Sequence, residues 1–367
     1  MARTRTKVGF KGNLKEIEVD VPEGEPAPWG ADARLAVVGT DVPRIDGADK
    51  VSGRAKFTFD QNPPGLLWAK MLHAPYGAAT IKTLDTRRAK LVPGVKAIHV
   101  IKDKGRPILH HGDEILAIAA ESEESAEEAL HAVDITYEMK PAVTTIDGAL
   151  RPGAPQVYPG ENNLKTGGGG GKRTEADAVG DSPAKSAKDK EVDAAFASAH
   201  RIVEGQYETQ TQTHSALETH GVVARFEKDG SLSVWASTQS TFGVKGGAVE
   251  ASGLPDGKVH VFSEFVGGGF GAKFTLAPSG LAAVALAKTT KRPVKLMLTR
   301  EGEHTTGGCR PCSRQKMRAA VRQDGKIVAA TVETWGSAGV AEGGAGAANP
   351  VIYHLGATAK KENHVFT

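Results

Sequence analysis

The residues most suited to chemistry form a glycine-rich run over 266–274, with the sequence VGGGFGAKF. An alternating apolar segment over 258–265 precedes it and predicts a strand, and an alanine- and leucine-rich segment over 275–288 predicts a helix. Three adjacent glycines let backbone N–H groups approach a ligand closely, because no Cβ stands in the way. A glycine loop that leads into a helix N-terminus favours an anion, since the free N–H groups and the helix dipole both attract negative charge.

Other interpretations of this run stay open at this point. A turn that binds nothing is one, because glycine clusters are common in turns. The spacing excludes the dinucleotide pattern G-x-G-x-x-G. A second glycine run, over 166–172, is not a phosphate-binding P-loop, because Thr166 replaces its first glycine and Arg173 replaces the residue that holds magnesium. Phe270 is the bulky side chain within the 266–274 loop and offers an apolar wall beside any ligand.

A second segment supports a specific identification. Residues 212–220 read QTHSALETH and lie upstream of the glycine loop. The two segments together resemble the molybdenum-cofactor-binding large subunits of the xanthine dehydrogenase and aldehyde oxidase family, which carry a G-G-G-F-G-x-K loop and an upstream Q-x-H-x-x-L-E stretch. The resemblance covers roughly residues 38–367, and both motifs occur in the expected order and at the expected separation.

The resemblance implies an oxidoreductase that hydroxylates its substrate with oxygen from water. Its cofactor would be a molybdenum–pterin group, either molybdopterin or its cytosine dinucleotide. The pterin holds the metal in this family, so the protein itself supplies no metal ligand, which agrees with a chain of only two cysteines. The expected partners are an iron–sulfur subunit and an FAD subunit, which would receive the electrons.

The resemblance also implies roles for particular residues. Gln212 would donate its amide N–H toward an oxo group on the metal, where an uncharged donor stabilises partial negative charge. His214, Glu218 and His220 have a spacing that could bind a metal, but we expect them to brace the loop. The other side of the pocket would be shaped by four loop residues: Gly268, Gly269, Phe270 and Gly271.

Phe274 departs from the family pattern and bears on the substrate. Purine-oxidising members have a glutamate after the loop lysine, and that glutamate hydrogen-bonds the substrate ring. Phenylalanine offers only an apolar, aromatic face. A site that lacks such a group loses its preference for ligands that need it. We therefore expect an aldehyde or an aromatic N-heterocycle as the small-molecule substrate, and not a purine.

Composition narrows the remaining classes of function. The 367 residues suffice for two or three domains, and 40% hydrophobic with 24% charged residues fits a globular protein. A net charge of +3 gives no reason to invoke nucleic acid. No apolar run approaches the ~20 residues of a membrane span. The basic start over 1–7 is not followed by an apolar segment, so we expect a cytoplasmic protein, or a periplasmic one exported with a signal-bearing partner.

Cys309 and Cys312 form a C-x-x-C pair. A zinc or iron–sulfur site needs about four ligands, and the chain has no second cysteine pair. A redox disulfide is one possibility. Our preferred interpretation is that both are ordinary residues of an arginine- and proline-containing loop.

The elements that must position these residues predict an α+β fold. We expect an N-terminal extension over 1–34 with a strand at 15–21, and a small α/β domain over 35–141 that resembles the family's hammerhead domain. A larger mixed α/β molybdopterin-binding domain, incomplete here, would occupy 200–367. Strands are predicted at 66–72, 95–101, 114–120, 134–138, 201–208, 221–227, 231–237, 293–299, 313–322 and 326–335, and further helices at 85–91, 122–133 and 240–253.

A linker over 142–199 separates the two predicted domains. Its middle, 162–190, is rich in Gly, Lys, Asp, Ser and Ala and includes five consecutive glycines, so we predict a flexible surface insertion. Docking of a partner is the alternative interpretation of this segment.

The family's later arginine-containing loop and its catalytic glutamate base have no counterpart in this sequence. The chain therefore resembles the first part of the large subunit, and we expect a complementary C-terminal chain to complete an active enzyme. The rival hypotheses are a truncated remnant that binds partners without a cofactor, and a member similar to carbon monoxide dehydrogenase.

Overall fold

The computed structural model describes residues 2–10, 13–21, 24, 28–166, 187–341, 353 and 355–367. Its contacts separate the chain into two units, Met1–Ala55 and Lys56–Thr367. In the first unit, β1 (Ala2–Phe10) and β2 (Asn13–Val21) form an antiparallel hairpin, and α1 (Gly47–Val51) follows. The strand predicted at 15–21 is thus confirmed within β2. Its partner β1 was not predicted, because residues 3–7 are all charged or polar and only Val8 and Phe10 are large and apolar.

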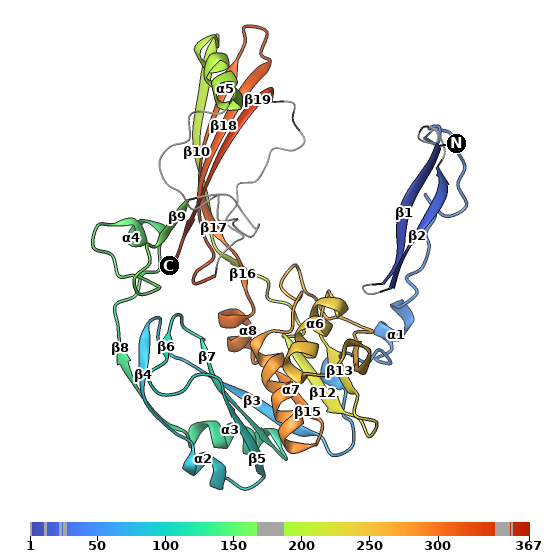
Figure 1. Cartoon of the computed structure of the whole chain (residues 1–367), viewed down its shortest axis with the longest axis vertical. Coiled ribbons are helices and arrows are strands. Elements are labelled where there is room, and N and C mark those ends of the chain that lie inside the picture. The colour runs from blue at the N-terminus through green and yellow to red at the C-terminus, as the bar shows by residue number, and fades with distance from the viewer. Residues whose placement is uncertain are drawn as a thin grey trace. The chain divides into compact units, whose positions relative to one another are not determined.

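A seven-stranded mixed sheet dominates the second unit, with the order β14-β13-β12-β15-β3-β7-β5 (Figure 1). Its strands are β3 (Leu67–His73), β5 (Val95–Val100), β7 (Glu114–Ala120), β12 (Gly221–Phe226), β13 (Leu232–Ala236), β14 (Val259–Phe262) and β15 (Val294–Met297). All seven lie within or beside predicted strands. Their alternating or continuous apolar residues form the largest core, packed against α6 (Thr241–Ser252) and α7 (Pro278–Thr290).

This sheet joins strands from both predicted domains. β3 runs parallel to β15, with Leu67 opposite Val294, and the Leu67 N–H donates to the Pro293 carbonyl at 2.8 Å. Strands from 67–120 and from 221–297 therefore share one sheet and one core, although the predicted domain boundaries themselves stay a prediction. A shared core matters for function, because it fixes the loops at the ends of β13 and β14 in a rigid frame.

A three-stranded sheet, β6-β4-β8, builds a second core beside this one. The sheet comprises β4 (Ala79–Asp85), β6 (Pro107–Ile108) and β8 (Asp134–Met139). Helices α2 (Arg87–Leu91) and α3 (Glu123–His131) pack on β3, β5 and β7 of the larger sheet and contribute Ala89 and Ala129 to this core. The Ser122 hydroxyl caps α3 by accepting from the Ser125 N–H at 3.1 Å, as its position predicted. β4 was not predicted, because Ile81 and Leu84 are its only large apolar residues and its last residue, Asp85, begins the helix predicted over 85–91.

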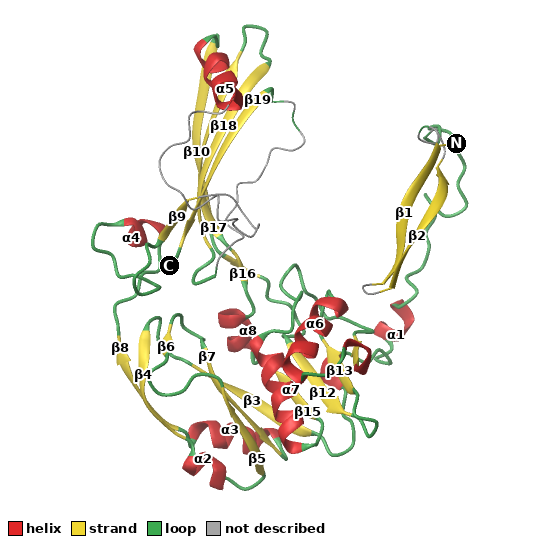
Figure 2. Cartoon of the chain, in the orientation of Figure 1, coloured by secondary structure: helices red, strands yellow, loops and turns green. Residues whose placement is uncertain are grey.

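A five-stranded sheet, with the order β10-β17-β18-β19-β9, forms the remaining layer (Figure 2). Its strands are β9 (Leu164–Thr166), β10 (Arg201–Thr209), β17 (Cys312–Val321), β18 (Ile327–Ser337) and β19 (Ala357–Val365). The hairpin predicted around Asp324 and Gly325 is confirmed. β19 was not predicted, and it pairs in parallel with β18. Helices α4 (Ile146–Leu150) and α5 (Ala187–Ala197) pack on this layer.

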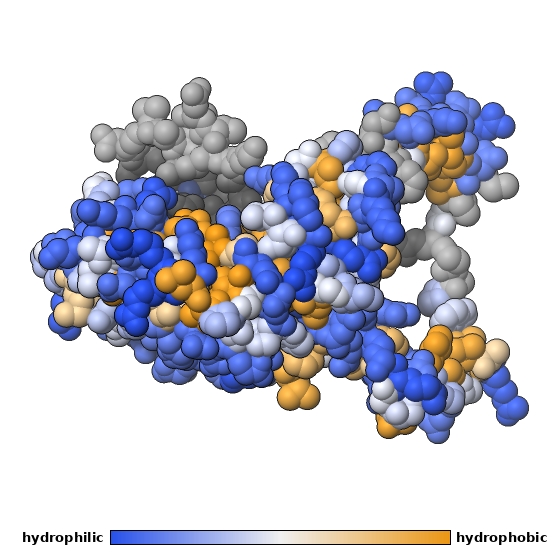
Figure 3. All heavy atoms as spheres, turned by 90° about the horizontal axis from the view of Figure 1, so that it is seen from below, coloured by the Kyte–Doolittle hydropathy of each residue, from blue (hydrophilic) through white to orange (hydrophobic). Residues whose placement is uncertain are grey.

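Shorter elements complete the described part of the second unit. They are η1 (Thr58–Asp60), η3 (Asp256–Lys258), α8 (Arg300–Thr306) and a two-stranded pair of β11 (Gln212–Thr213) with β16 (Cys309–Arg310). None of the helices found in the described residues is both long enough and apolar enough to cross a membrane. Hydrophilic side chains cover most of the face shown in Figure 3, with smaller hydrophobic patches between them.

The flexible insertion predicted over 162–190 can be compared with the structure only at its two ends. Its five-glycine run over 167–171, and residues up to 186, lie outside the described residues. Its two ends are ordered elements, which corrects the predicted bounds: β9 pairs with β19, and α5 begins at Ala187. Asn163 is buried, and its amide donates to the carbonyls of Ala149 at 3.3 Å and Pro155 at 2.9 Å.

This difference predicts contrasting results for two deletions. Replacing 167–186 by a Gly/Ser linker of about ten residues should change the free energy of unfolding by less than ~1 kcal/mol, since loop length enters closure entropy logarithmically. Deleting 162–190 should lower it by about 3 kcal/mol, because it removes the Asn163 hydrogen bonds and strand β9. Urea unfolding of both variants beside the unmodified chain measures the contrast. Equal losses in the two deletions would contradict it.

Candidate functional site

The glycine loop, residues 266–274, follows β14 and has a conformation that only glycine adopts easily. Gly268 and Gly271 have φ angles of +105° and +99°. A Cβ on Gly267 would lie 2.5 Å from the Glu218 Cβ, and one on Gly269 would lie 2.3 Å from Gln239 Oε1. Two of the glycines are thus required by backbone conformation, and two by the close approach of neighbouring side chains.

The loop does not run directly into a helix, which corrects the sequence prediction. The helix predicted from 275 begins at Pro278, and Ala277 at its N-cap offers no side-chain hydrogen bond. Any anion must therefore be held by the loop itself. Within the described chain, the backbone N–H groups of Gly268, Gly269 and Phe270 donate to no protein acceptor. Backbone N–H groups that have no protein acceptor suit anionic or partly negative oxygens.

Glu218 fastens the start of the loop. Its Oε2 accepts from the Gly267 N–H at 2.7 Å and from the Ser237 hydroxyl at 2.9 Å. Its Oε1 accepts from the Thr58 N–H of η1 at 3.1 Å. The Glu218 backbone N–H also donates to the Gly267 carbonyl at 3.2 Å. One carboxylate thus joins three chain segments at the loop.

Lys273 fastens the other end of the loop from inside the protein. Its side chain is 1% exposed, and its ammonium group donates to the Glu218 carbonyl at 2.6 Å and to the Ser237 hydroxyl at 2.7 Å. Burial lowers the pKa of Lys273 below its usual value, while the carboxylates of Glu218 and Glu303 oppose that shift. The lysine therefore serves as an internal tie and does not face a ligand.

His220 and Glu303 form a buried pair beneath the same loop. The Glu303 carboxylate, carried by α8, accepts from the His220 backbone N–H at 2.6 Å and lies 2.9 Å from its ring Nδ1. The other ring nitrogen lies 3.3 Å from the Ala272 carbonyl of the loop. Burial alone would raise the pKa of Glu303, but the hydrogen bonds from the His220 side chain and backbone hold it below its usual value.

Gln239 contacts the glycine loop and was not predicted from the sequence. Its Oε1 accepts from the loop N–H groups of Gly271 at 3.0 Å and Lys273 at 3.4 Å, and its own backbone N–H donates to the Lys273 carbonyl at 2.8 Å. Two loop donors fix the carbonyl end of the amide, so the NH₂ group is held with a defined orientation. In the described residues this NH₂ donates to no acceptor, and Gln239 is exposed. The sequence did offer one indication of this role. Gln239 comes shortly after a buried strand, following Trp235-Ala236-Ser237-Thr238, which is a position where side chains often reach a site.

Comparison with known proteins identifies what this arrangement belongs to. The molybdopterin cofactor-binding domain family matches residues 177–359, which include the glycine loop and Gln239. The nicotinate dehydrogenase large molybdopterin subunit of Eubacterium barkeri is 29% identical over 320 residues, covering 83% of this chain and 71% of its own length. The chain belongs to the xanthine dehydrogenase and aldehyde oxidase family of molybdenum-cofactor-binding subunits.

Two further comparisons define how much of such a protein is present. The aldehyde oxidoreductase molybdenum-binding subunit of Escherichia coli (strain K12) is 28% identical over 340 residues, covering 87% of this chain but 42% of that protein. The carbon monoxide dehydrogenase of Oligotropha carboxidovorans has the same fold, with a TM-score of 0.74 and 23% identity, over 90% of this chain and 44% of that one. The chain therefore matches less than half the length of two of these relatives and 71% of the third.

The residues predicted from the sequence fall into two groups in this molybdenum-cofactor-binding subunit. The structure joins Glu218 and His220 to the glycine loop by hydrogen bonds, in agreement with the bracing role expected for them. Gln212 lies on β11 opposite Arg310 of β16, and its side chain makes no hydrogen bond to the described residues. No hydrogen bond joins His214 to the loop in the described residues, and its Nδ1 is buried without a partner there.

The remaining predicted residues are two phenylalanines of the loop and the cysteine pair on β16 and β17. Phe270 and Phe274 are 71% and 50% exposed. Cys309 and Cys312 are half-buried free thiols, and burial raises the pKa of Cys309 above its usual value, which is the opposite of what a reactive thiol needs.

The donor set fits the molybdenum–pterin group that the family implies. A Cβ at Gly271 would meet no atom within 4 Å, so the space beside the loop is open. The three free N–H groups of 268–270 suit phosphate or oxo oxygens, and the oriented Gln239 amide adds an uncharged donor. No thiolate is needed from the chain, because the pterin supplies the sulfur ligands.

Proposed function

We propose that this chain forms one wall of the molybdenum–pterin pocket in an oxidoreductase that hydroxylates an aldehyde or an aromatic N-heterocycle with oxygen from water. The observation that supports it is the glycine loop, with three free N–H groups beside the oriented amide of Gln239. Electrons would leave through an iron–sulfur subunit and an FAD subunit. The pterin would be molybdopterin or its cytosine dinucleotide.

When bound, the molybdenum–pterin group supplies the two-electron oxidation that lets oxygen from water enter the substrate. The chain supplies binding and orientation. The N–H groups of 268–270 hold negatively charged oxygens, and the Gln239 NH₂ donates to a partly negative oxygen at its side of the pocket. Glu218 and Lys273 keep these donors in place, so little reorganisation is needed when charge develops. Gln212 remains a candidate for the same donor role from the family resemblance.

In this proposal the rest of the pocket is formed by the portion that the relatives carry outside the region matched by this chain. The aligned region fills 71% of the E. barkeri protein but 42% of the E. coli protein, so the former is much the shorter chain. A short molybdopterin subunit therefore exists among the relatives. A remnant without cofactor is the rival, because the described residues alone leave the loop open on one side.

Metal content of the purified complex tests the proposal. The chain should be expressed in its own host with its neighbouring genes, purified through a tag on this chain, and analysed for molybdenum, copper and pterin. We expect near-stoichiometric molybdenum and pterin, together with at least one further polypeptide. A purified chain that unfolds cooperatively as a monomer and never contains molybdenum under these conditions would establish the remnant instead.

Phe274 predicts the substrate preference. An aromatic wall favours flat or apolar substrates by about 25 cal/mol per Å² of buried area, and leaves the ring nitrogens of a purine unpaired at about 1–3 kcal/mol each. Benzaldehyde should therefore be oxidised with a higher kcat/KM than hypoxanthine. Phe274→Glu should lower the benzaldehyde value about tenfold, because it places a carboxylate against an apolar substrate. Phe274→Leu is the control and should change it much less. A wild-type preference for hypoxanthine, or no effect of the glutamate, would remove Phe274 from the substrate pocket.

A further inference from the structure

The turn between β6 and β7, residues 109–113, is rich in side chains that bind metal ions. It reads LHHGD, and Glu114 follows at the start of β7. His110, Asp113 and Glu114 each offer one ligand atom, and these three atoms lie within 4.8 Å of one another. One imidazole with two carboxylates is a donor set that suits zinc and other first-row transition metals.

The backbone around this turn is held from two sides. The Ala74 N–H donates to the Asp113 carbonyl at 2.8 Å, and the Gly112 N–H donates to the Ala74 carbonyl at 2.8 Å. Gly112 has a φ angle of +93°, and a Cβ there would lie 2.4 Å from the Thr305 Cβ of α8. The end of β3 and helix α8 therefore fix the turn, so its side chains are preorganised.

His110 presents the kind of nitrogen that a metal needs. Its Nδ1 lies 2.9 Å from the backbone carbonyl of His111, which can only accept, so Nδ1 carries the proton. Nε2 then keeps its lone pair. Metal-binding histidines usually donate their other ring N–H to a carbonyl or carboxylate in this way, which fixes the tautomer.

Glu114 is a half-buried carboxylate that lacks a cation. In the part of the chain that the structure describes, no ion pair joins it to a lysine or an arginine. Burial raises the pKa of Glu114 above its usual value, and the hydrogen bond from its own backbone N–H opposes this shift. Buried carboxylates are normally paired or bind a metal ion, because the loss of hydration disfavours their charge.

Asp113 is buried and only one of its oxygens is used by the protein. Its Oδ2 accepts from the Lys102 ammonium group at 2.5 Å and from the Leu109 N–H at 3.0 Å. Among the described residues, Oδ1 accepts no hydrogen bond. Two carboxylates against one ammonium group leave an excess of negative charge at the turn, which favours a cation.

His73 carries a further unsatisfied group beside these residues. It is the antiparallel strand partner of Glu114, and its Nε2 is buried without a hydrogen-bond partner in the described chain. Burial lowers the pKa of His73 below its usual value, so its ring is neutral. Few buried nitrogens in proteins stay unpaired. A water molecule bound to a metal at the turn is a donor that could satisfy it.

We propose that His110, Asp113 and Glu114 bind a divalent transition-metal ion, with water in the remaining positions. Mg²⁺ and Ca²⁺ prefer oxygen ligands alone, whereas Zn²⁺ readily accepts an imidazole together with carboxylates. The site goes beyond the proposed function and does not rest on it, because the pterin holds the molybdenum there.

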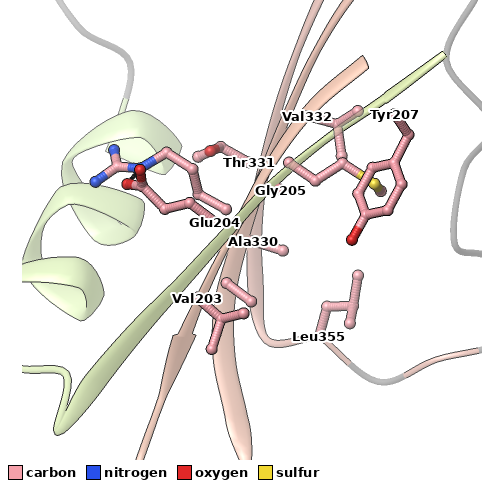
Figure 4. Close-up of a pocket in the computed structure, with 11 residues that line it drawn as sticks. Val203, Glu204, Gly205, Tyr207, Ala330, Thr331, Val332 and Leu355 are labelled. Carbon is pink, nitrogen blue, oxygen red and sulfur yellow. Dashed lines mark hydrogen bonds and ion pairs between the residues drawn. The ribbon is translucent and has the colours of Figure 1, made fainter. Parts of the chain in front are cut away.

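The hollow of about 210 Å³ on the five-stranded sheet does not compete for such an ion. Its lining is mainly apolar and includes Val203, Val332 and Leu355 (Figure 4). Glu204 is the carboxylate in this lining, and it forms an ion pair with Arg318 at 2.6 Å. The thiols of the C-x-x-C pair are therefore the competing ligands that an experiment must separate from the turn.

Zinc titration of the full-length chain tests the site. The chain is treated with EDTA, dialysed and titrated with Zn²⁺ in a calorimeter, both as it is and with Cys309→Ser and Cys312→Ser combined. We expect about one Zn²⁺ to bind with or without the thiols. In the thiol-free chain, His110→Ala and Glu114→Gln should each weaken binding at least ~10-fold. His111→Ala is the matched control and should leave the affinity unchanged, because His111 is exposed and lies outside the set of ligands.

Thermal melting of Glu114→Gln gives a second measurement that misfolding cannot imitate. In EDTA this variant should melt no lower than the unmodified chain, since it loses a half-buried charge that has no ion pair. In excess Zn²⁺ the unmodified chain should melt at a higher temperature than in EDTA, because an ion that binds the folded state stabilises it. The variant should gain much less from the same Zn²⁺ concentration.

Four outcomes would overturn the site. These are no Zn²⁺ binding by the unmodified chain, an unchanged affinity in His110→Ala, full stabilisation of Glu114→Gln by Zn²⁺, and loss of binding when the two cysteines alone are replaced. The last result would assign the ion to the thiols. None of these measurements depends on molybdenum, so the metal site and the proposed function can fail separately.

Discussion

Gln239→Ala should lower kcat about 100-fold while the molybdenum content of the complex stays near normal. The structure orients this amide through the Gly271 and Lys273 N–H groups and leaves its NH₂ free beside the loop. A preorganised donor that meets developing negative charge stabilises the transition state more than the bound substrate, so kcat falls and KM changes little. Steady-state kinetics with benzaldehyde and metal analysis of the same preparations provide the measurement.

Gln212→Ala is the matched comparison for this result, because it removes the same side chain from the position that the family resemblance favours. The geometry predicts a smaller loss of kcat for this variant. Gln212 lies on β11, where it is the strand partner of Arg310 on β16, and it makes no hydrogen bond to the described loop residues. If Gln212→Ala produces the 100-fold loss and Gln239→Ala does not, Gln212 is the donor. Loss of molybdenum in Gln239→Ala would mean that this residue holds the cofactor and does not tune its reactivity.

Lys273→Met should lower the free energy of unfolding by about 3 kcal/mol and abolish molybdenum binding. Methionine preserves most of the buried volume but removes the ammonium group that donates to the Glu218 carbonyl and the Ser237 hydroxyl. Those two acceptors then lose a buried donor, and the carboxylates of Glu218 and Glu303 lose the nearby positive charge. Because Glu218 also holds Gly267, the whole loop loosens.

Urea unfolding and metal analysis measure both effects. Lys82→Met is the control, since Lys82 is exposed on β4 and its replacement should stay within about 0.5 kcal/mol. Lys273→Arg separates charge from shape, because it keeps the charge but cannot fit the same enclosed space. A Lys273→Met chain with unchanged stability would show that the buried ammonium contributes nothing to the loop. Normal molybdenum content in that variant would show that the tied loop conformation is not needed for cofactor binding.

Local sequence patterns predicted the strands and helices with the clearest periodicity. β7 was predicted at its observed bounds, and the hairpins of β12 with β13 and of β17 with β18 follow from Asp-Gly turns between alternating runs. β1, β4 and β19 were missed, because few apolar residues mark their positions. Their pairing is decided by neighbouring strands: β19, for example, packs in parallel against β18.

The sequence by itself determined the family, through two motifs whose spacing is specific, and it determined that the 266–274 loop must be glycine-rich. Only the tertiary structure decided which side chains meet that loop. Gln239 contacts it from 32 residues away along the chain, and the Glu303 carboxylate reaches His220 across 83 residues. The contact of Gln239 depends on the shared core, which fixes β13 and β14 on either side of it. Hydrophobic burial is not directional, so no local pattern in the sequence reveals which distant side chains it brings together.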